Sequence, residues 1–202
     1  MNIGIVITCY NDHGVLEKCI KSISNVRALI ENQIDLSLFV VAIDDCSTDS
    51  SSTLLAMALH EKKIDAFFTN KTNKGVSFSR NRGIVACSGT DYVTFVDSDD
   101  TINDELIKVF TKDVSADLVV CNFSVVNSSS GKRFENCFFE SDKELSSEDL
   151  VTYLLKYYQQ PNKRSLFTTC WGKFYKTKTL LAEKKIFFKE RLHLCEDTEF
   201  VH

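Results

Sequence analysis

The sequence of 202 residues predicts an α/β fold with a mostly parallel central sheet, helices on both of its faces and a small antiparallel region in the C-terminal half. Two observations predict this class. Short apolar runs rich in β-branched residues alternate four times with segments of helical periodicity across roughly the first 110 residues, which is typical of a parallel sheet covered by helices. Each run also ends in polar or acidic residues, and open α/β sheets bind ligands at the carboxyl ends of their strands.

Composition and charge narrow the class of protein further. A hydrophobic share of 44% and a charged share of 26% are typical of globular domains, so we expect one folded domain over 1–202. The net charge of −4 and the scattered lysines and arginines argue against a nucleic-acid binder. No apolar run approaches the ~18 residues that span a bilayer. The eight cysteines show no CxxC spacing and the chain starts without a signal peptide, which predicts reduced thiols in the cytoplasm and no zinc site.

The elements of the first half follow from the apolar runs and from the polar residues between them. The run 3–9 is almost continuously apolar, as expected for a strand buried on both faces, and Asn11 or Asp12 caps the helix that follows. Each later apolar run is likewise predicted to be a strand, and the polar residues after it to cap the next helix. The predicted strands are 3–9, 36–43, 65–69 and 92–96, and the predicted helices run from these caps to 30, from 47–49 to 63, over 76–87 and onward from 103 or 104.

The second half lacks this regular alternation, which is why an antiparallel region is expected there. The predicted elements are strands over 118–126, 133–139 and 186–188, a helix over 146–160 that Pro161 ends, and a short helix at 180–181.

Asp97, Ser98 and Asp99 directly follow the predicted strand 92–96. Two carboxylates at i and i+2 can converge on one hard cation, and Mg²⁺ and Mn²⁺ favour carboxylates together with phosphate oxygens. Such an ion would bridge a nucleotide diphosphate and stabilise it as a leaving group. The alternative is a solvated acidic turn that caps the next helix.

Two more polar segments follow strands of the same predicted sheet. Asp44 comes at the end of the strand 36–43, where an acid can accept hydrogen bonds from a ribose or a base; alternatively, the segment 44–49 only caps the next helix. Gly75 permits a tight turn before a helix N-terminus, which suits an anion, and Arg80 lies one turn into that helix. The alternative there is a surface helix with solvated arginines.

The remaining candidates lie toward the C-terminus. Asp197, beside Glu196, is a candidate general base if this segment folds against the end of the sheet; otherwise it belongs to a solvated tail.

Taken in order, these segments resemble the motifs of the family 2 glycosyltransferases, which have the GT-A (Rossmann-like) fold. The resemblance covers nearly the whole chain and rests on six motifs in one order, each of them short. One departure is Cys46, where the family often has a small residue such as glycine. The motifs are Thr8-Cys9-Tyr10-Asn11, Asp44 to Asp49, Asn73 to Asn81, Asp97-Ser98-Asp99, Trp171 to Tyr175, and Phe188-Lys189-Glu190 followed by Glu196-Asp197.

The resemblance implies a role for each matching residue. Asp99 and Asp97 are implied to hold Mn²⁺ or Mg²⁺ with the diphosphate. Asp197 is implied to be the general base, supported by Glu196. Trp171 is implied to stack on a sugar face of the acceptor, with core packing as the alternative. His202 is implied to be a metal ligand, with a frayed end of the chain as the alternative. We expect 1–112 to form the nucleotide-binding half and 113–202 the acceptor-side half of one catalytic domain. Nucleotide-sugar contacts are implied for Thr8, Tyr10, Asn11, Asp44, Asn73, Arg80, Asp97 and Ser98.

The implied activity is a metal-dependent, inverting sugar transfer in one displacement. The expected sugar donor is a UDP-hexose or a UDP-N-acetylhexosamine. The expected acceptor is a hydroxyl of a glycan or lipid-linked glycan that belongs to a bacterial surface polysaccharide or lipooligosaccharide. We expect no nucleic-acid partner, and we expect a cytoplasmic protein, with the inner face of the cell membrane as its alternative site.

Two other classes of protein stay open. A non-catalytic or donor-only sugar-nucleotide-binding module would hold the donor without transfer, and the presence of both Asp99 and Asp197 argues against it. A GT-A-like nucleotidyltransferase usually carries a Gly-rich loop with a basic residue after the first strand, and 8–13 has none. Because the chain ends five residues after Asp197, we expect a domain truncated at its C-terminus. Any peripheral membrane association is then expected to reside in a further C-terminal segment.

Overall fold

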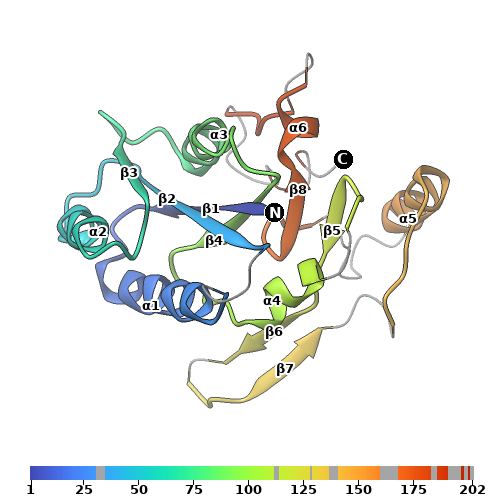
Figure 1. Cartoon of the computed structure of the whole chain (residues 1–202), viewed down its shortest axis with the longest axis horizontal. Helices are drawn as coiled ribbons and strands as arrows, with labels where there is room; N and C mark the ends of the chain where they lie inside the picture. The colour runs from blue at the N-terminus through green and yellow to red at the C-terminus, as the bar shows by residue number, and fades with distance from the viewer. Residues whose placement is uncertain are drawn as a thin grey trace.

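The computed structural model places a central sheet between two layers of helices (Figure 1). The helices α1 His13–Ile30 and α2 Ser51–His60 cover one face of the sheet, and α3 Val76–Ala86 covers the other. This is the α/β class that the sequence predicts. The structure describes residues 1–30, 35–111, 114–127, 129–136, 141–159, 168–182, 186–190, 197 and 200.

The main sheet has six strands in the order β3-β2-β1-β4-β8-β5. Its four parallel strands are β1 Asn2–Cys9, β2 Ser37–Asp44, β3 Ala66–Thr69 and β4 Tyr92–Asp97. The strands β8 Lys173–Lys176 and β5 Leu118–Val120 complete it, with β8 antiparallel to both β4 and β5. Because β1 pairs with β2 on one side and β4 on the other, the carboxyl ends of these three strands lie side by side.

The apolar run of β1 explains its central place. Seven of its eight residues are buried, and successive side chains of a strand point to opposite faces. Ile5 and Ile7 belong to the core under α1 and α2, whereas Val6 belongs to the core under α3. A strand that buries both faces must be apolar throughout, which is why the sequence shows a run here rather than an alternation.

A glycine allows α3 to lie very close to β1. A Cβ atom added at Gly83 would stand 2.2 Å from Cγ1 of Val6, closer than any real contact. Only glycine therefore permits this approach. It brings Arg80, one turn earlier on the same helix, over the carboxyl edge of the sheet.

The strand predicted over 118–126 is two strands in the structure. The first part is β5; the second is β6 Phe123–Val126, which pairs with β7 Arg133–Asn136 in a separate antiparallel sheet. The N–H of Cys121 still donates to the carbonyl of Gly172 at 2.8 Å, but Gly172 turns the partner chain away with a φ of 67°. The prediction is wrong at this point because β5 runs out of partner beyond Cys121.

Two further differences concern the last third of the chain. The sequence does not predict β8, because its four residues KFYK begin and end with lysine and form no apolar run. The strand predicted over 186–188 is not a strand, because the backbone of Phe188 pairs with the side chain of Asn81 instead of with a neighbouring strand. The antiparallel region itself is confirmed.

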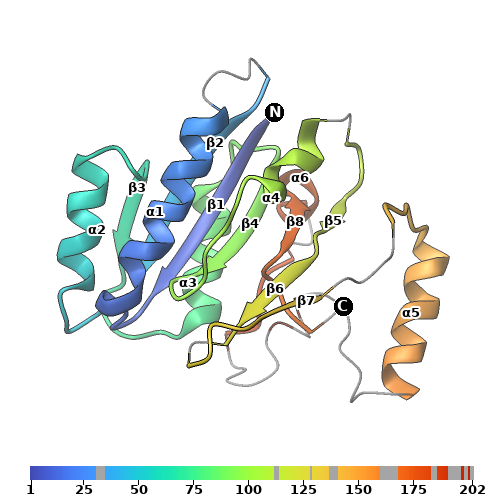
Figure 2. The same ribbon diagram turned by 90° about the horizontal axis from the view of Figure 1, so that it is seen from below.

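The remaining helices are short or lie apart from the parallel strands. They are α4 Glu105–Lys108 with a 3-10 turn over Val109–Thr111, α5 Ser147–Gln159 and α6 Thr177–Leu180. Both ribbon views place α5 at the side of the molecule, away from β1 to β4 (Figures 1 and 2). The helices predicted over 146–160 and at 180–181 are thus present with small shifts of their ends.

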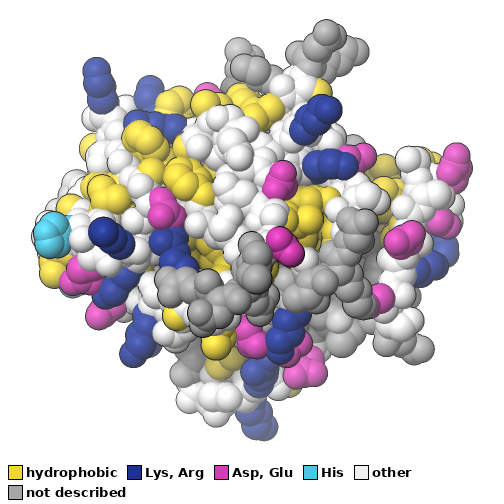
Figure 3. All heavy atoms as spheres, viewed as in Figure 1, with side chains coloured by type: hydrophobic (Ala, Val, Ile, Leu, Met, Phe, Trp, Pro, Cys, Tyr) yellow, Lys and Arg dark blue, Asp and Glu magenta, His cyan; other side chains and the backbone are white. Residues whose placement is uncertain are grey.

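The surface charge, the cysteines and the helices agree with the class of protein that the composition predicts. On the face shown in Figure 3, lysine and arginine side chains are scattered among acidic ones. The described cysteines are all free thiols, in line with the predicted reduced state: Cys9, Cys19, Cys46, Cys87, Cys121 and Cys170. Within the described residues, none of the helices combines the length and the apolar character that crossing a membrane requires.

Candidate active site

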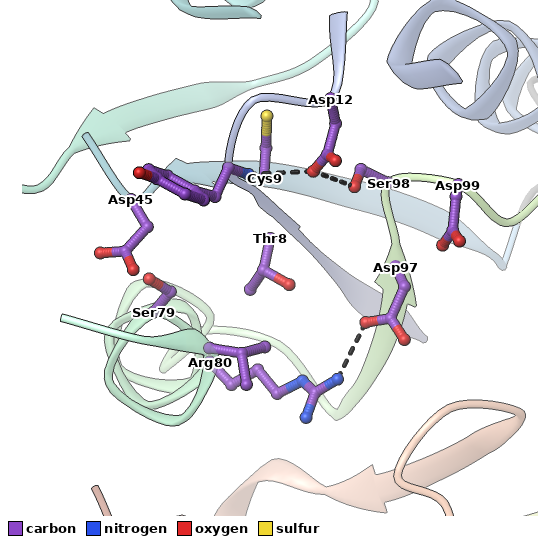
Figure 4. Close-up of a pocket in the computed structure, with 11 residues that line it drawn as sticks. Thr8, Cys9, Asp12, Asp45, Ser79, Arg80, Asp97, Ser98 and Asp99 are labelled. Atoms are coloured by element: carbon purple, nitrogen blue, oxygen red, sulfur yellow. Dashed lines mark hydrogen bonds and ion pairs between the residues drawn. The ribbon is translucent and has the colours of Figure 1, made fainter. Parts of the chain in front are cut away.

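A pocket opens at the carboxyl edge of the parallel strands, beside the N-terminal part of α3 (Figure 4). Its volume is about 270 Å³. The strand order changes direction between β1 and β4, and open α/β sheets bind ligands at such a switch point. The residues that line the pocket are Thr8, Cys9, Tyr10, Asp12, Asp45, Val76, Ser79, Arg80, Asp97, Ser98 and Asp99.

The structure brings together about half of the residues that the sequence singles out. Those in the pocket lining are Thr8, Tyr10, Arg80, Asp97, Ser98 and Asp99. Those outside the lining are Asn11, Asp44, Asn73 and Trp171. Asp197 is tied to the pocket through Arg80. Glu196 and His202 lie outside the described residues.

Asn11 builds the loop that borders the pocket. Its backbone has a φ of 57°, in the left-handed region that asparagine tolerates better than most residues. Its side-chain oxygen accepts hydrogen bonds from the N–H groups of Thr48 (2.7 Å) and Asp49 (3.3 Å). Its own N–H donates to the hydroxyl of Ser47 at 2.9 Å. Asn11 therefore joins the loop after β1 to the turn before α2.

Asp45, rather than Asp44, presents its carboxylate to the pocket. Asp44 is 0% exposed, and it accepts hydrogen bonds from the N–H (3.1 Å) and hydroxyl (2.5 Å) of Ser47 and from the hydroxyl of Ser52 (2.6 Å). These bonds hold the turn before α2, which is the capping alternative. Asp45 is 4% exposed and accepts hydrogen bonds from Nδ2 of Asn70 (2.7 Å) and from the N–H groups of Lys74 (2.9 Å) and Gly75 (2.6 Å), and it also lies in the pocket lining. The pocket lining therefore includes Asp45 and not Asp44, and the nucleotide contact of Asp44 stays a prediction.

Asn73 and Trp171 also serve local structure. Asn73 is exposed, and its side-chain oxygen accepts the N–H of Gly75 at 3.2 Å, in a turn where Gly75 has a φ of 86°. Trp171 packs edge-to-face against Phe123, with ring centroids 4.7 Å apart. Of the two alternatives for Trp171, this contact favours packing.

The loop after β4 concentrates negative charge at the pocket. Asp99 is exposed, and Asp97 lies beside it in the lining. Partial loss of solvent, together with the carboxylates of Asp97 and Asp99, raises the pKa of Asp100 to about 6. Carboxylate oxygens at this density are the ligands that Mg²⁺ and Mn²⁺ prefer, so the residues fit the predicted ion. In the described part of the chain, no three His, Cys, Asp or Glu side chains surround one ion site, which leaves substrate oxygens to complete a coordination shell.

Arg80 joins the pocket to the C-terminal segment. Its side chain is 4% exposed, and one guanidinium nitrogen donates to Oδ1 of Asp97 at 2.9 Å while another donates to Oδ1 of Asp197 at 2.6 Å. The second oxygen of Asp197 accepts the N–H of Cys170 at 3.3 Å. Asp197 is therefore fixed close to Asp97 by a buried cation, rather than solvated in a tail.

Sequence reasoning missed several residues that shape the site. Asp12 lines the pocket, and its Oδ2 accepts the N–H of Tyr10 (2.9 Å) and the hydroxyl of Ser98 (2.6 Å), which ties the ends of β1 and β4 together (Figure 4). Ser79 and Asp45 were within the quoted motifs without a role of their own. Both Asp12 and Asp45 lie within three residues of the end of a parallel strand, which is the signal that also marks the predicted site residues.

Comparison with known proteins bears on the class of this protein rather than on single residues. The sequence matches the family described as Glycosyl transferase family 2 over residues 4–183. It is 29% identical over 179 residues to glycosyltransferase GlyA of Streptococcus pneumoniae, which covers 87% of this chain and 24% of that protein. It is 29% identical over 203 residues to the poly(ribitol-phosphate) beta-N-acetylglucosaminyltransferase TarS of Staphylococcus aureus, which covers 99% of this chain and 32% of that protein. The chain thus spans a third or less of the length of these relatives.

Solved structures share the fold. S. aureus TarS 1–349 in complex with UDP-GlcNAc is similar with a TM-score of 0.73 at 23% identity, covering 100% of this chain and 52% of that one. The mannosyltransferase PcManGT of Pyrobaculum calidifontis, in complex with GDP-Man and Mn²⁺, is similar with a TM-score of 0.60 at 13% identity, covering 98% and 50%. These likenesses confirm the GT-A fold. Because the family match runs from β1 past α6 and so includes the whole pocket, the chain belongs to glycosyl transferase family 2.

Proposed function

We propose that this protein transfers a sugar from a nucleotide-diphosphate donor to a hydroxyl group of a glycan acceptor. The observation that carries the proposal is the ion-pair network of Arg80, which holds Asp97 of the pocket and Asp197 of the C-terminal segment on one guanidinium. A carboxylate for the leaving-group side and a carboxylate for the acceptor side are thereby brought together. Family membership supports the same reaction class.

The pocket supports a nucleotide as the bound part of the donor. We assign the nucleoside to Thr8, Tyr10 and Asp45, since Tyr10 is 45% exposed and offers a ring face for stacking. The relative TarS is named for N-acetylglucosaminyl transfer, and TarS has been solved with UDP-GlcNAc. UDP-N-acetylglucosamine is therefore the first donor we propose, and a UDP-hexose the second.

Asp97 and Asp99 are the residues that would hold Mn²⁺ or Mg²⁺ together with the diphosphate. A bound divalent ion supplies charge stabilisation for the departing diphosphate. Oδ1 of Asp97 already accepts a hydrogen bond from Arg80, whereas Asp99 is exposed and lies in the pocket lining. The guanidinium of Arg80 adds a permanent positive charge at the same edge.

Asp197 is the general base in this proposal. An acceptor hydroxyl has a pKa far above 7, so its attack on the sugar is assisted by a positioned carboxylate that takes the proton. Arg80 and the N–H of Cys170 orient the two oxygens of Asp197. With the base and the diphosphate on opposite faces of the sugar, one displacement inverts the anomeric centre and leaves no covalent enzyme intermediate. We propose Glu196 as the supporting acid.

The acceptor side is proposed from the C-terminal half. We assign the acceptor to the half 113–202, whose β6–β7 sheet lies outside the parallel core, and the donor to 1–112. The proposed acceptor class is a glycan or lipid-linked glycan; the relative TarS is named for poly(ribitol-phosphate), a polyol phosphate that offers hydroxyl groups as well. The proposed setting is the cytoplasm at the inner face of the membrane.

The experiment that tests this function measures UDP release from UDP-N-acetylglucosamine and UDP-glucose in the presence of Mn²⁺ or Mg²⁺, with GDP- and dTDP-sugars as comparison donors. We expect slow UDP release even without acceptor, and loss of release when the divalent ion is chelated. If the protein binds a nucleotide sugar tightly but forms no free nucleotide from any of these donors, a sugar-nucleotide-binding module would be supported instead.

A pair of neighbouring variants tests the assignment of the nucleoside. Asp45→Asn should weaken UDP binding about tenfold, because the side chain in the pocket lining loses its charge. It should also lower the melting temperature, because the carboxylate accepts hydrogen bonds from Asn70, Lys74 and Gly75. Asp44→Asn changes the same group one residue earlier, under the turn before α2, and should lower the melting temperature more than the UDP affinity of the folded protein. Calorimetric titration of both variants with UDP decides, and equal UDP affinity in the two would remove Asp45 from the nucleoside site.

A further inference from the structure

We infer that Asn81 is a positioning residue that fixes the segment carrying Asp197 onto α3. The inference rests on the proposed sugar transfer and adds a residue to which the reaction assigns no chemical step. Asn81 is 6% exposed. The N–H of Phe188 donates to its Oδ1 at 2.8 Å, and its Nδ2 donates to the carbonyl of Phe188 at 2.9 Å.

The Asn81 amide takes the place of a neighbouring strand. A side-chain amide offers one acceptor and two N–H donors, so it satisfies both backbone polar groups of one residue. Its second N–H donates to Oε1 of Glu190 at 3.1 Å. The segment 186–190 is thereby held on α3 although it belongs to no sheet.

The aromatic ring of the same residue adds a second anchor. Phe188 is 2% exposed and packs edge-to-face on Phe95 of β4, with ring centroids 5.3 Å apart. It also stacks on Phe200, with centroids 3.8 Å apart and an angle of 9° between the rings. Asp197 lies between these two stacked residues along the chain, so both sides of it are fixed to the same point of the core.

Adjacent residues of α3 therefore act on two points of one segment. Arg80 binds the carboxylate of Asp197, and Asn81 binds the backbone nine residues earlier. The place of Asp197 relative to Asp97 depends on these side chains, because neither Asp197 nor the segment 186–190 pairs with the main sheet. The pocket itself does not include Asn81. Loss of this contact should therefore disturb transfer while leaving nucleotide binding in place.

Asn81→Asp is the test, because aspartate keeps the shape of the side chain. The carboxylate loses both N–H groups and faces the carbonyl of Phe188 and the carboxylate of Glu190. We expect UDP affinity and donor KM to stay near the wild-type values and kcat to fall about 10- to 100-fold, since a displacement of the order of 1 Å at a catalytic group costs this much. Hydrogen exchange should accelerate in peptides that cover 186–190 and 197–200, and not in peptides of β1 and β4.

Two further variants make the test specific. Asn81→Asp combined with Glu190→Gln restores an N–H donor opposite the new carboxylate and should recover part of the lost kcat. Asn25→Asp makes the same change of charge at an exposed position of α1, outside the pocket lining, and should leave kcat, KM and exchange unchanged. Asn81→Ser, which is smaller and uncharged, repeats the test without added charge.

The outcomes separate this inference from the proposed function. Wild-type protein that releases no UDP from any donor contradicts the proposed function, and hydrogen exchange still tests the contact. Unchanged kcat and exchange in folded Asn81→Asp would overturn the inference. A parallel loss of UDP affinity, or unfolding of both the Asp and Ser variants, would overturn it as well, because Asn81 would then support the whole fold rather than the segment of Asp197.

Discussion

The two halves of the molecule hold the carboxylates of the proposed site in different ways. In the parallel half, Asp45 directly follows β2 and Asp97 ends β4; β2 has five buried residues of eight and β4 five of six. In the C-terminal half, β5, β6 and α5 contain no buried residue in the described part of the chain. Asp197 is held there by side chains that reach over from α3.

This difference implies that the proposed donor binding and the proposed transfer depend on separate sets of contacts. The pocket is a consequence of the sheet, so it persists as long as the parallel strands pack. The position of Asp197 is a consequence of a few polar contacts and of the stacked rings of Phe188 and Phe200, with Arg80 as the link between the halves. Substitutions should therefore separate binding from catalysis according to the half that they affect.

Asp197→Asn should give the largest effect. The amide keeps the shape of the side chain but cannot accept the proton of an acceptor hydroxyl, so kcat should fall about 10²- to 10⁴-fold. UDP affinity should stay within about twofold of the wild type, since the pocket is built by the other half. Rates of UDP release and calorimetric titration with UDP measure the two quantities. A variant with normal kcat would place the base elsewhere.

Arg80→Met should break the link itself. Removal of the cation leaves the carboxylates of Asp97 and Asp197 without their shared partner, which costs roughly 3 kcal/mol of folding free energy, at the low end for buried pairs because Asp97 is 31% exposed. Chemical denaturation measures the loss. Arg27→Met removes an arginine that pairs with Asp65 nearer the surface, and should cost about 1 kcal/mol or less. Equal losses in the two variants would contradict a special role for Arg80.

The same comparison explains which elements of the fold could be predicted from the sequence. Each of β1 to β4 has a local signal, an apolar run that ends in polar residues, so their order and the place of the pocket could be predicted. β8 has no such signal, because it pairs across the sheet with Tyr92 and Val93 of β4 and its own ends are lysines. Its place depends on partners distant in the sequence.

Individual site residues were harder to predict than the site. Asp44 and Asp45 are chemically identical, and which of them faces the pocket depends on where β2 ends, since successive side chains point to opposite faces. The contact between Asn81 and Phe188 joins residues 107 positions apart, which no local pattern shows. Motif order thus predicted the family and the edge of the sheet, whereas geometry decided the individual contacts.

Gly83→Ala should disturb the parallel half with a smaller effect. The new methyl group would stand 2.2 Å from Cγ1 of Val6, and overpacking of this kind costs about 1–3 kcal/mol. Gly14→Ala is the matched control in α1, where nothing lies within 4 Å of the added atom, and it should be neutral or stabilise the helix by up to about 1 kcal/mol. Urea denaturation compares them. Equal stability of the two variants would mean that α3 moves away from β1 at little cost.

Lys173 offers the finest test, because it lies in β8, the strand that joins the halves. It is 1% exposed, and its ammonium group donates to the carbonyl (2.6 Å) and hydroxyl (3.0 Å) of Thr169. Burial lowers the pKa of Lys173 from 10.5 to about 8. Between these two values the unfolded chain holds a proton that the folded protein releases, so the free energy of unfolding should rise with pH above about 8 and stay level below it.

Lys173→Met removes this titration while keeping an unbranched side chain of similar length. The difference in unfolding free energy between wild type and variant should therefore shift by about 1–2 kcal/mol in favour of the wild type from pH 7 to pH 9.5. Urea denaturation of both proteins across this range measures the shift. A difference that stays constant would mean that Lys173 keeps its proton throughout. The strand β8 would then hold a charged, buried lysine without a pH-dependent loss of unfolding free energy. In that case the contrast between the packing of the parallel half and that of the C-terminal half would be weaker at β8.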